Sequence, residues 1–239
     1  MYKRQILSIE SGTNTCSVAL SNGEKLIDCI ESHDQEYNHA KQLTQFIEAI
    51  LKNTGTDTGQ LEAIAVSKGP GSYTGLRIGV SVAKGMCYAL NIPLIAPESL
   101  LVMSSGLLQE MNQSKAPLPD LLCPMIDARR MEVYTQVFDI KLNAVTGVEA
   151  KILDSSSFME FLDTRRIMFF GNGSSKAKSV LTHSNALFYD DFKPSARFMI
   201  PIAWNYYLNA KFEDVAYFEP LYLKDFIATV PKNKTSGNP

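Results

Sequence analysis

The sequence predicts an α/β protein of two lobes, because short apolar strands alternate with amphipathic helices and this order occurs twice along the chain. Three strands fill the first 30 residues, and Asn22-Gly23 between apolar runs is a strong hairpin signal. A polar, proline-broken stretch at residues 112–119 separates the two halves. We therefore expect one lobe over residues 1–111, a second over 112–229 and a polar, disordered tail over 230–239.

The first half supplies the elements of the predicted N-terminal lobe in a defined order. Strands are expected at residues 4–10, 15–20 and 25–30, then a helix at 39–53, a strand at 63–67, a helix at 75–90, a strand at 92–96 and a helix that begins at 97–99. Leu43, Phe46 and Ile50 lie on one apolar face of the first helix, and Gly55 is a fitting stop. Three antiparallel strands followed by helix, strand and helix form half of the actin/hexokinase/Hsp70-like ATPase fold, a ribonuclease H-like arrangement of mixed sheets with flanking helices.

The second half repeats this theme more loosely. Strands at residues 122–126 and 133–138 flank a turn at 127–131, and helices are expected near 156–163, 174–181 and 194–211 with strands between them. The prediction is therefore a two-lobed actin-like fold whose second lobe is the looser copy.

Composition and charge limit the classes of function. The 239 residues are 45% hydrophobic and 20% charged, and no apolar run approaches the ~20 residues that span a bilayer. Cys16, Cys29, Cys87 and Cys123 lie far apart in apolar segments, so we expect buried free thiols and a cytoplasmic protein without membrane contact. The net charge is −2 and no basic stripe is present, so tight binding of RNA by this chain alone is not expected.

The glycine-rich stretch Gly69-Pro70-Gly71-Ser72-Tyr73-Thr74-Gly75 is the most informative part of the sequence. It is no Walker loop, because no Gly-Lys-Ser/Thr ends it, and no nucleophile elbow, because proline stands two residues before Ser72. What remains is a tight turn at a helix N-terminus with Thr74 as the expected N-cap. Such a turn could hold an anion or pack without a ligand, and the residues alone weigh these two interpretations equally.

Small residues recur every four positions along the second helix, at Gly75, Gly79 and Ala83. Glycine inside a helix costs roughly 1 kcal/mol relative to alanine, so a close approach of another element should offset it. The neighbour is either the first helix of the same chain or a second subunit.

Several segments together resemble the TsaB family, the tRNA threonylcarbamoyladenosine biosynthesis subunit once described as a glycoprotease homologue. These segments are Ile6-Leu7-Ser8-Ile9-Glu10-Ser11, Cys16-Ser17-Val18-Ala19-Leu20, the glycine loop with Leu76-Arg77-Ile78-Gly79, and Ile126-Asp127-Ala128-Arg129-Arg130 with Glu132-Val133-Tyr134. The resemblance is dense from Ile6 to Phe138 and loose afterwards. It implies a two-lobed actin-like fold, a homodimer of the isolated chain, pairing with the catalytic paralogue TsaD and TsaE as a third partner. It also implies contact with tRNA only through the complex, no cofactor required by this chain alone, and ATP or ADP at the complex interface.

The catalytic paralogue carries a metal-binding H-x-x-x-H motif that this chain lacks. The corresponding stretch at residues 97–103 has no histidine, and the only histidines are His33, His39 and His183. Glu10 stands where actin-like ATPases carry a magnesium-binding aspartate, and we favour a role for it in accepting hydrogen bonds from the following turn. A second nucleotide loop would fall at Gly171-Asn172-Gly173. The candidate phosphate or nucleotide contacts are Glu10, Gly12, Thr13, Gly71, Ser72, Gly171 and Gly173. Asp127 and Arg129 form either a salt bridge at the end of a hairpin or an acid–base or anion site.

Three hypotheses follow from these patterns. The first is a non-catalytic subunit that docks on TsaD through its first two helices, the second is a small ATPase or kinase that uses Glu10 and the glycine loops, and the third is a metalloprotease. The missing histidine pair argues against the third. The predicted docking residues are His39, Leu43, Gly75, Gly79, Val82, Ala83 and Met86.

Overall fold

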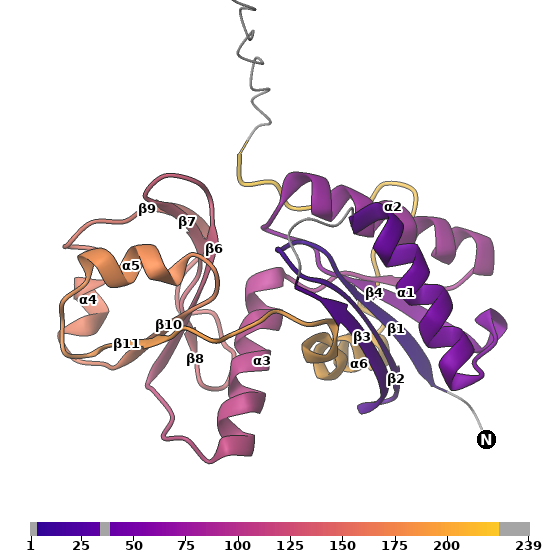
Figure 1. The fold of residues 1–239 in the computed structure, drawn as a ribbon, viewed down its shortest axis with the longest axis horizontal. Coiled ribbons are helices and arrows are strands. Elements are labelled where there is room, and N and C mark those ends of the chain that lie inside the picture. Colours follow the sequence, from indigo (N-terminus) through magenta and orange to yellow (C-terminus); the bar gives the residue numbers. More distant parts are fainter. Residues whose placement is uncertain (1–3, 34–38, 225–239) are drawn as a thin grey trace, which may run out of the picture.

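The computed structural model describes residues 4–33 and 39–224 and shows two lobes, each built on a mixed sheet (Figure 1). The predicted fold class is confirmed. The tail expected at residues 230–239 lies outside the described residues.

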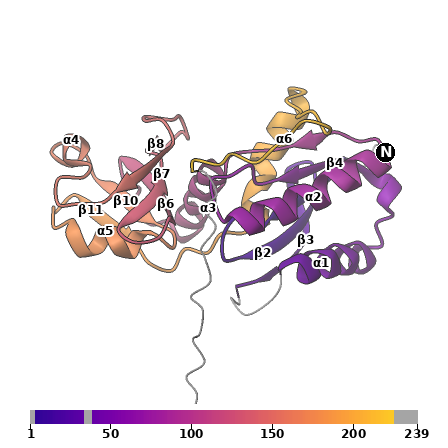
Figure 2. The ribbon, with the colours of Figure 1, turned by 90° about the horizontal axis from the view of Figure 1, so that it is seen from above.

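The first lobe is a five-stranded sheet in the order β3-β2-β1-β4-β5. Strands β1, β2 and β3 are antiparallel neighbours, whereas β4 runs parallel to both β1 and β5. The first elements are β1 (Gln5–Glu10), β2 (Cys16–Asn22), β3 (Lys25–Ser32), α1 (His39–Thr54), η1 (Thr58–Gln60), β4 (Leu61–Val66), α2 (Tyr73–Leu90), β5 (Leu94–Ile95) and α3 (Ser99–Ser114). Side chains alternate across β1, so Leu7 and Ile9 pack with α1 and α2 while Ile6 faces the core on the other side of the sheet. Figure 2 shows α1 and α2 together on one side of this sheet and α6 on the other.

The second lobe repeats the connections of the first. Its sheet has the order β11-β10-β6-β7-β9, in which β10 is parallel to β6 and β11 while β6, β7 and β9 are antiparallel neighbours. Its elements are β6 (Leu121–Asp127), β7 (Glu132–Thr135), β8 (Phe138–Asp139), β9 (Glu149–Ile152), α4 (Met159–Leu162), β10 (Ile167–Phe170), α5 (Ser174–Val180) and β11 (Ala186–Tyr189). The predicted repeat of the theme is therefore present as a repeat of strand order and direction.

The lobe boundaries differ from those expected. Helix α3 runs to Ser114, into the stretch expected as a linker. After β11 the chain crosses back, and η2 (Ala196–Met199) and α6 (Ile200–Leu208) pack against β1 of the first sheet. The lobe expected over residues 112–229 thus ends near β11, because the apolar residues of η2 and α6 are buried on the first sheet.

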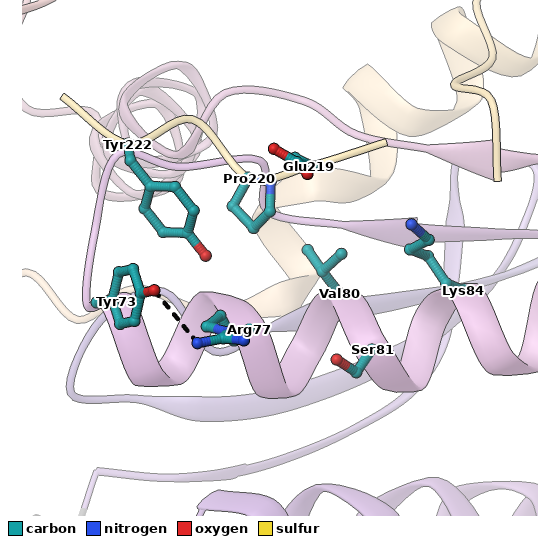
Figure 3. Close-up of a pocket in the computed structure, with 8 residues that line it drawn as sticks. All are labelled: Tyr73, Arg77, Val80, Ser81, Lys84, Glu219, Pro220 and Tyr222. Atoms are coloured by element: carbon teal, nitrogen blue, oxygen red, sulfur yellow. Dashed lines mark hydrogen bonds between the residues drawn. The ribbon is translucent and has the colours of Figure 1, made fainter. Parts of the chain in front are cut away.

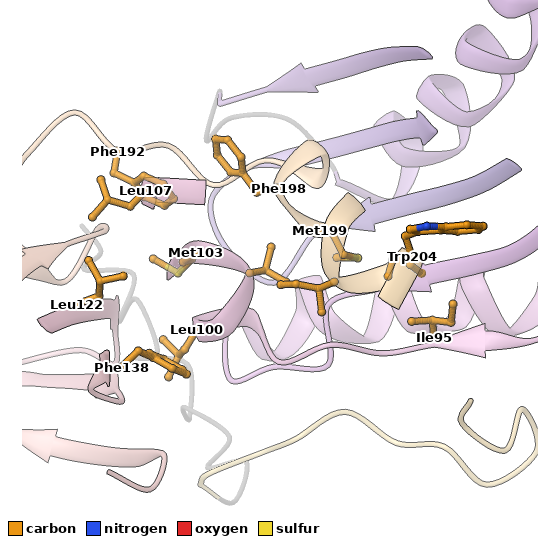
Figure 4. Close-up of a cluster of buried hydrophobic side chains, with 14 of the residues drawn as sticks. Ile95, Leu100, Met103, Leu107, Leu122, Phe138, Phe192, Phe198, Met199 and Trp204 are labelled. Atoms are coloured by element: carbon orange, nitrogen blue, oxygen red, sulfur yellow. The ribbon is translucent and has the colours of Figure 1, made fainter. Parts of the chain in front are cut away.

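One apolar core joins the two lobes (Figure 4). It holds Ile6 and Ile95 of the first sheet together with Leu122 and Phe170 of the second. Helix α3 crosses η2 closely, since a side chain at Gly106 would overlap the ring of Phe198. The first hairpin and the glycine loop are therefore attached to a sheet whose two faces are both buried.

Candidate functional site

Glu10, at the end of β1, is buried with 2% of its surface exposed. Its Oε1 accepts a hydrogen bond from the Gly12 backbone N–H at 2.8 Å, and the Ser67 hydroxyl donates to its Oε2. Burial raises the pKa of this carboxyl, and the bonds from Ser67, Gly12 and Thr13 oppose that rise. The carboxylate therefore serves the turn that follows β1, which is the interpretation favoured from the sequence.

The glycine loop packs directly on that turn. The Ser72 N–H donates to the Gly12 carbonyl oxygen at 2.7 Å, and the Ser11 hydroxyl donates to the Gly75 carbonyl at 2.9 Å. A side chain at Gly71 would overlap the Gly12 carbonyl, so only glycine permits this approach. Thr13 is buried beside them and accepts from the Thr15 N–H. The structure thus brings Glu10, Gly12, Gly71 and Ser72 together as partners of one another.

The N-cap of α2 is Ser72, which corrects the expectation of Thr74. The Ser72 hydroxyl accepts a hydrogen bond from the Gly75 N–H at 3.3 Å, and the helix begins at Tyr73. Thr74 lies in the first turn and is exposed. The helix starts earlier than predicted because the serine, with extended backbone angles, reaches back to the first turn.

The stripe Gly75, Gly79 and Ala83 is buried inside the first lobe. Side chains at Gly75 or Gly79 would overlap the carbonyl or the hydroxyl oxygen of Ser11, and Gly79 also lies against Val66. For Gly75 and Gly79 the close neighbour is therefore the turn after β1 and the end of β4.

This burial corrects the predicted docking surface. Leu43, Gly75, Gly79 and Ala83 are covered by their own lobe and cannot face a partner. Val82 and Met86 are half-buried on the flank of α2, and the side chain of His39 lies outside the described part.

The second lobe carries a corresponding loop after β10. The Gly173 N–H donates to the Met125 carbonyl at 3.0 Å, and Asn172 Oδ1 accepts from the Asp127 N–H at 2.9 Å. Gly171 has φ +94°, a conformation that other residues rarely adopt. Gly171 and Gly173 therefore hold their own hairpin and lie in a different lobe from Gly12 and Gly71.

Asp127 forms an ion pair with Lys176 at 2.9 Å, where the sequence suggested Arg129. Arg129 contributes its backbone N–H to Asp127 Oδ1 at 2.6 Å. Arg129 and Arg130 occupy the turn with φ of 71° and 47°, so both are left-handed. The hairpin end is thus closed by a lysine of α5.

The thiols and histidines add no metal site in residues 4–33 and 39–224, where no group of three or more potential ligands is found. All four cysteines are free; three are buried and Cys29 is half-buried. His33 lies with its Nδ1 3.0 Å from the Thr15 hydroxyl. None of the helices in these ranges is long and apolar enough to cross a bilayer.

Sequence reasoning missed a groove on the outer side of α2 (Figure 3). Its volume is about 580 Å³, and one wall is α2 while the other is the extended segment 219–222. It is lined by Tyr73, Arg77, Val80, Ser81, Lys84, Glu219, Pro220 and Tyr222. The available signal was the polar and aromatic series Tyr73, Arg77, Ser81, Lys84 and Tyr88, which recurs at helical spacing.

Comparison with known proteins places this architecture in a family. The family described as "TsaD: tRNA N6-adenosine threonylcarbamoyltransferase" matches residues 32–232. The chain belongs to this family. Similar curated relatives include the tRNA threonylcarbamoyladenosine biosynthesis proteins TsaB of Haemophilus influenzae and Escherichia coli. They are 29% and 28% identical to this chain, covering 94% of it in both cases and 95% and 96% of their own lengths.

The resemblance to TsaB stated from the sequence is therefore confirmed. A solved structure shows the same fold over nearly the whole chain. It is a Pseudomonas aeruginosa protein described as similar to the peptidase YeaZ, with a TM-score of 0.81 at 20% identity, covering 92% of this chain and 100% of that one.

Proposed function

We propose that this chain is a non-catalytic, cytoplasmic subunit of the machinery that places threonylcarbamoyl on a tRNA adenosine, and that it acts by docking on the catalytic paralogue TsaD. The pathway is named in the TsaB relatives that match almost the full chain. The same proposal includes three further points. TsaE is a third partner, the isolated chain forms a homodimer, and ATP or ADP binds at the interface of the complex.

The observation that carries the proposal is the internal use of Glu10 and the glycine loop. Both carboxylate oxygens of Glu10 accept bonds from the first lobe itself, and the Ser72 amide is bonded to Gly12. A magnesium-holding carboxylate and phosphate-holding amides need free lone pairs and free N–H groups. Each oxygen of Glu10 already accepts one bond and the Ser72 N–H is bonded, so a magnesium ion or a phosphate would compete with contacts inside the lobe, which supports a structural role for these groups.

The docking surface follows from what α2 leaves exposed next to α1. Ile78 and Val82 are half-buried there, and Gly85 and Ala89 are exposed on the same helical face. A side chain at Gly85 would meet nothing within 4 Å in the chain. Glycine in mid-helix costs roughly 1 kcal/mol, and a partner helix lying close to Gly85 would offset that cost. Two adjacent helices can supply much of the roughly 1,600 Å² that a stable complex buries.

Reconstitution tests the proposal. The purified chain, TsaD and TsaE would be mixed with tRNA and the threonylcarbamoyl donor, and modified adenosine would be measured with each protein omitted in turn. We expect no product from the chain alone and little product without it. Phosphate release from Mg-ATP by the pure chain that Glu10→Ala abolishes would contradict the proposal and favour the small ATPase.

Two glycines of the same helix supply a matched pair for the interface. Gly79→Leu should lower the melting temperature, because Gly79 lies against Ser11 and Val66. Gly85→Leu should leave melting unchanged and weaken binding to TsaD, measured by calorimetry. Unchanged binding with Gly85→Leu would place the interface elsewhere.

A further inference from the structure

The groove on α2 has a composition that the docking proposal does not use. Tyr73 and Tyr222 pack their rings at one end, with centroids 4.8 Å apart. Tyr88 and Tyr217, both more than 80% exposed, flank Lys84 at the other end: Tyr88 follows one turn later, and Lys84 Nζ bonds the carbonyls of Ala216 and Phe218. Two tyrosines thus line the groove, and two more lie on either side of Lys84, just beyond its lining; two of the four come from the helix and two from a segment more than 120 residues away in the sequence.

Two cations lie between the aromatic ends. Arg77 lies 5.3 Å from the centre of the Tyr73 ring and donates to its hydroxyl at 3.2 Å. Among the described residues neither Arg77 nor Lys84 is in an ion pair, because the carbonyls and the ring that hold them carry no net charge. Figure 3 shows Arg77 and the Tyr222 hydroxyl pointing into the same open space. Neither charge is therefore neutralised by these partners, and Lys84 keeps one of the three N–H donors of its ammonium group for a ligand.

The positions are fixed by the fold. The Leu221 N–H donates to the Lys68 carbonyl at 2.8 Å, which holds the segment 219–222 beside the start of α2. Lys224 extends this segment to an ion pair with Glu132 of the second lobe. The spacing of rings and cations along the groove is thus set before a ligand arrives.

We propose that this groove binds a single-stranded segment of the RNA substrate, with bases on the exposed rings of Tyr88 and Tyr217 and on the face of Tyr222 opposite Tyr73, and phosphates at Arg77 and Lys84. Aromatic faces that alternate with cations are the common device for single strands, since every base has a flat face and every linkage a charge. An acidic peptide would use the cations and leave the ring faces unused. Glu219 limits the positive charge of the groove, which keeps the affinity of the isolated chain low. The identity of the RNA as tRNA rests on the proposed function.

The direct test is equilibrium binding of a fluorescein-labelled single-stranded RNA of about ten nucleotides, a length within known site sizes, to the full chain at low ionic strength. Tyr222→Ala should weaken binding at least about fivefold, the change that about 1 kcal/mol of lost stacking produces. Arg77→Gln should weaken binding and lower the salt slope by about 0.7. Glu219→Gln should strengthen it.

Arg165→Gln is the matched control, because it removes the same charge from an exposed arginine of the second lobe. It should change nothing, and thermal melting checks that every variant folds. RNA affinity unchanged by Arg77→Gln and Tyr222→Ala would overturn the proposal. Equal weakening by Arg165→Gln would also overturn it, since the binding would then be a general charge effect.

The reconstituted complex separates this proposal from the proposed function. If the wild-type chain supports modification, Arg77→Gln should raise KM for tRNA several-fold at unchanged kcat. If the wild-type chain supports modification but Arg77→Gln alters only its affinity for TsaD, the groove is a protein contact and the RNA proposal fails alone. If the wild-type chain binds the oligonucleotide as described but supports no modification, the proposed function is contradicted and the RNA-binding proposal for the groove still stands.

Discussion

The two lobes share one topology and use it differently at the end of their first strand. In the first lobe Glu10 is buried and bonded to Gly12 and Ser67. In the second lobe Asp127 is exposed and paired with Lys176. The helix that follows the glycine loop has 18 residues in the first lobe and 7 in the second. The comparison teaches that the same position at the end of the first strand can hold a carboxylate that is bonded inside its lobe, as Glu10 is, or one that lies at the surface, as Asp127 does.

The largest effect should come from closing the approach that glycine permits. Gly75→Ala would overlap the Ser11 carbonyl, so we expect a loss of about 1–3 kcal/mol and a fall in melting temperature of roughly 2–4 °C per kcal/mol. Gly173→Ala meets its nearest atoms in the second lobe at 2.9–3.2 Å and should cost less. Gly85→Ala meets nothing and should stabilise by up to about 1 kcal/mol. A ranking other than this one in thermal melting would show that the loops of the two lobes are not packed as described.

The next largest effect should be a difference in stability between variants of the two carboxylates, Glu10 and Asp127. Glu10→Ala leaves the Gly12 N–H and the Ser67 hydroxyl buried without an acceptor, at a cost of about 1–3 kcal/mol. Asp127→Ala removes an exposed ion pair worth about 0–1 kcal/mol. Urea unfolding of both variants measures the difference, and equal losses would mean that the buried carboxylate is not the structural one.

The helix caps predict a smaller contrast. Ser72→Ala should cost about 1 kcal/mol, because the Gly75 N–H loses its acceptor, whereas Thr74→Ala should cost little. Helix α5 of the second lobe begins at Ser174, and its N-cap residue Gly173 supplies no side-chain cap. If Thr74→Ala proves the costlier change, the cap is the threonine expected from the sequence.

The smallest expected effect is on pH dependence. Burial raises the pKa of Glu10 in the folded chain, so the proton stays bound to a higher pH than in the unfolded chain. Its contribution is therefore greatest below about 4.3, the unfolded value, and is lost as pH rises through the folded pKa. Glu10→Gln removes this dependence.

Urea unfolding of wild type and Glu10→Gln across this pH range is the measurement. The free energy of unfolding of the wild type minus that of the variant should fall as pH rises. A difference that grows with pH would mean that the lobe stabilises the charged carboxylate.

The sequence predicted the first lobe well because its signals are local. The hairpin at Asn22-Gly23 and the periodic helices before and after the glycine loop lie within one or two residues of their observed places. The return of α6 to the first sheet was not predictable, since the burial of Trp204 depends on which sheet its apolar face meets. The prediction that the Gly79 stripe faces a partner was wrong for a similar reason. The spacing of small residues shows that a neighbour is close, but it does not show which element supplies that neighbour. The groove could not be predicted either, because its walls come from two segments that lie far apart in the sequence.

The central claim is that this chain contributes a docking helix and no active site of its own. The most direct test is the rate of tRNA modification by the reconstituted complex containing either Glu10→Gln or Gly85→Leu, with equal melting temperatures required of both. We predict a near wild-type rate with Glu10→Gln and a large loss with Gly85→Leu that a higher concentration of TsaD restores. Loss of the rate with Glu10→Gln, together with full activity of Gly85→Leu, would contradict the claim.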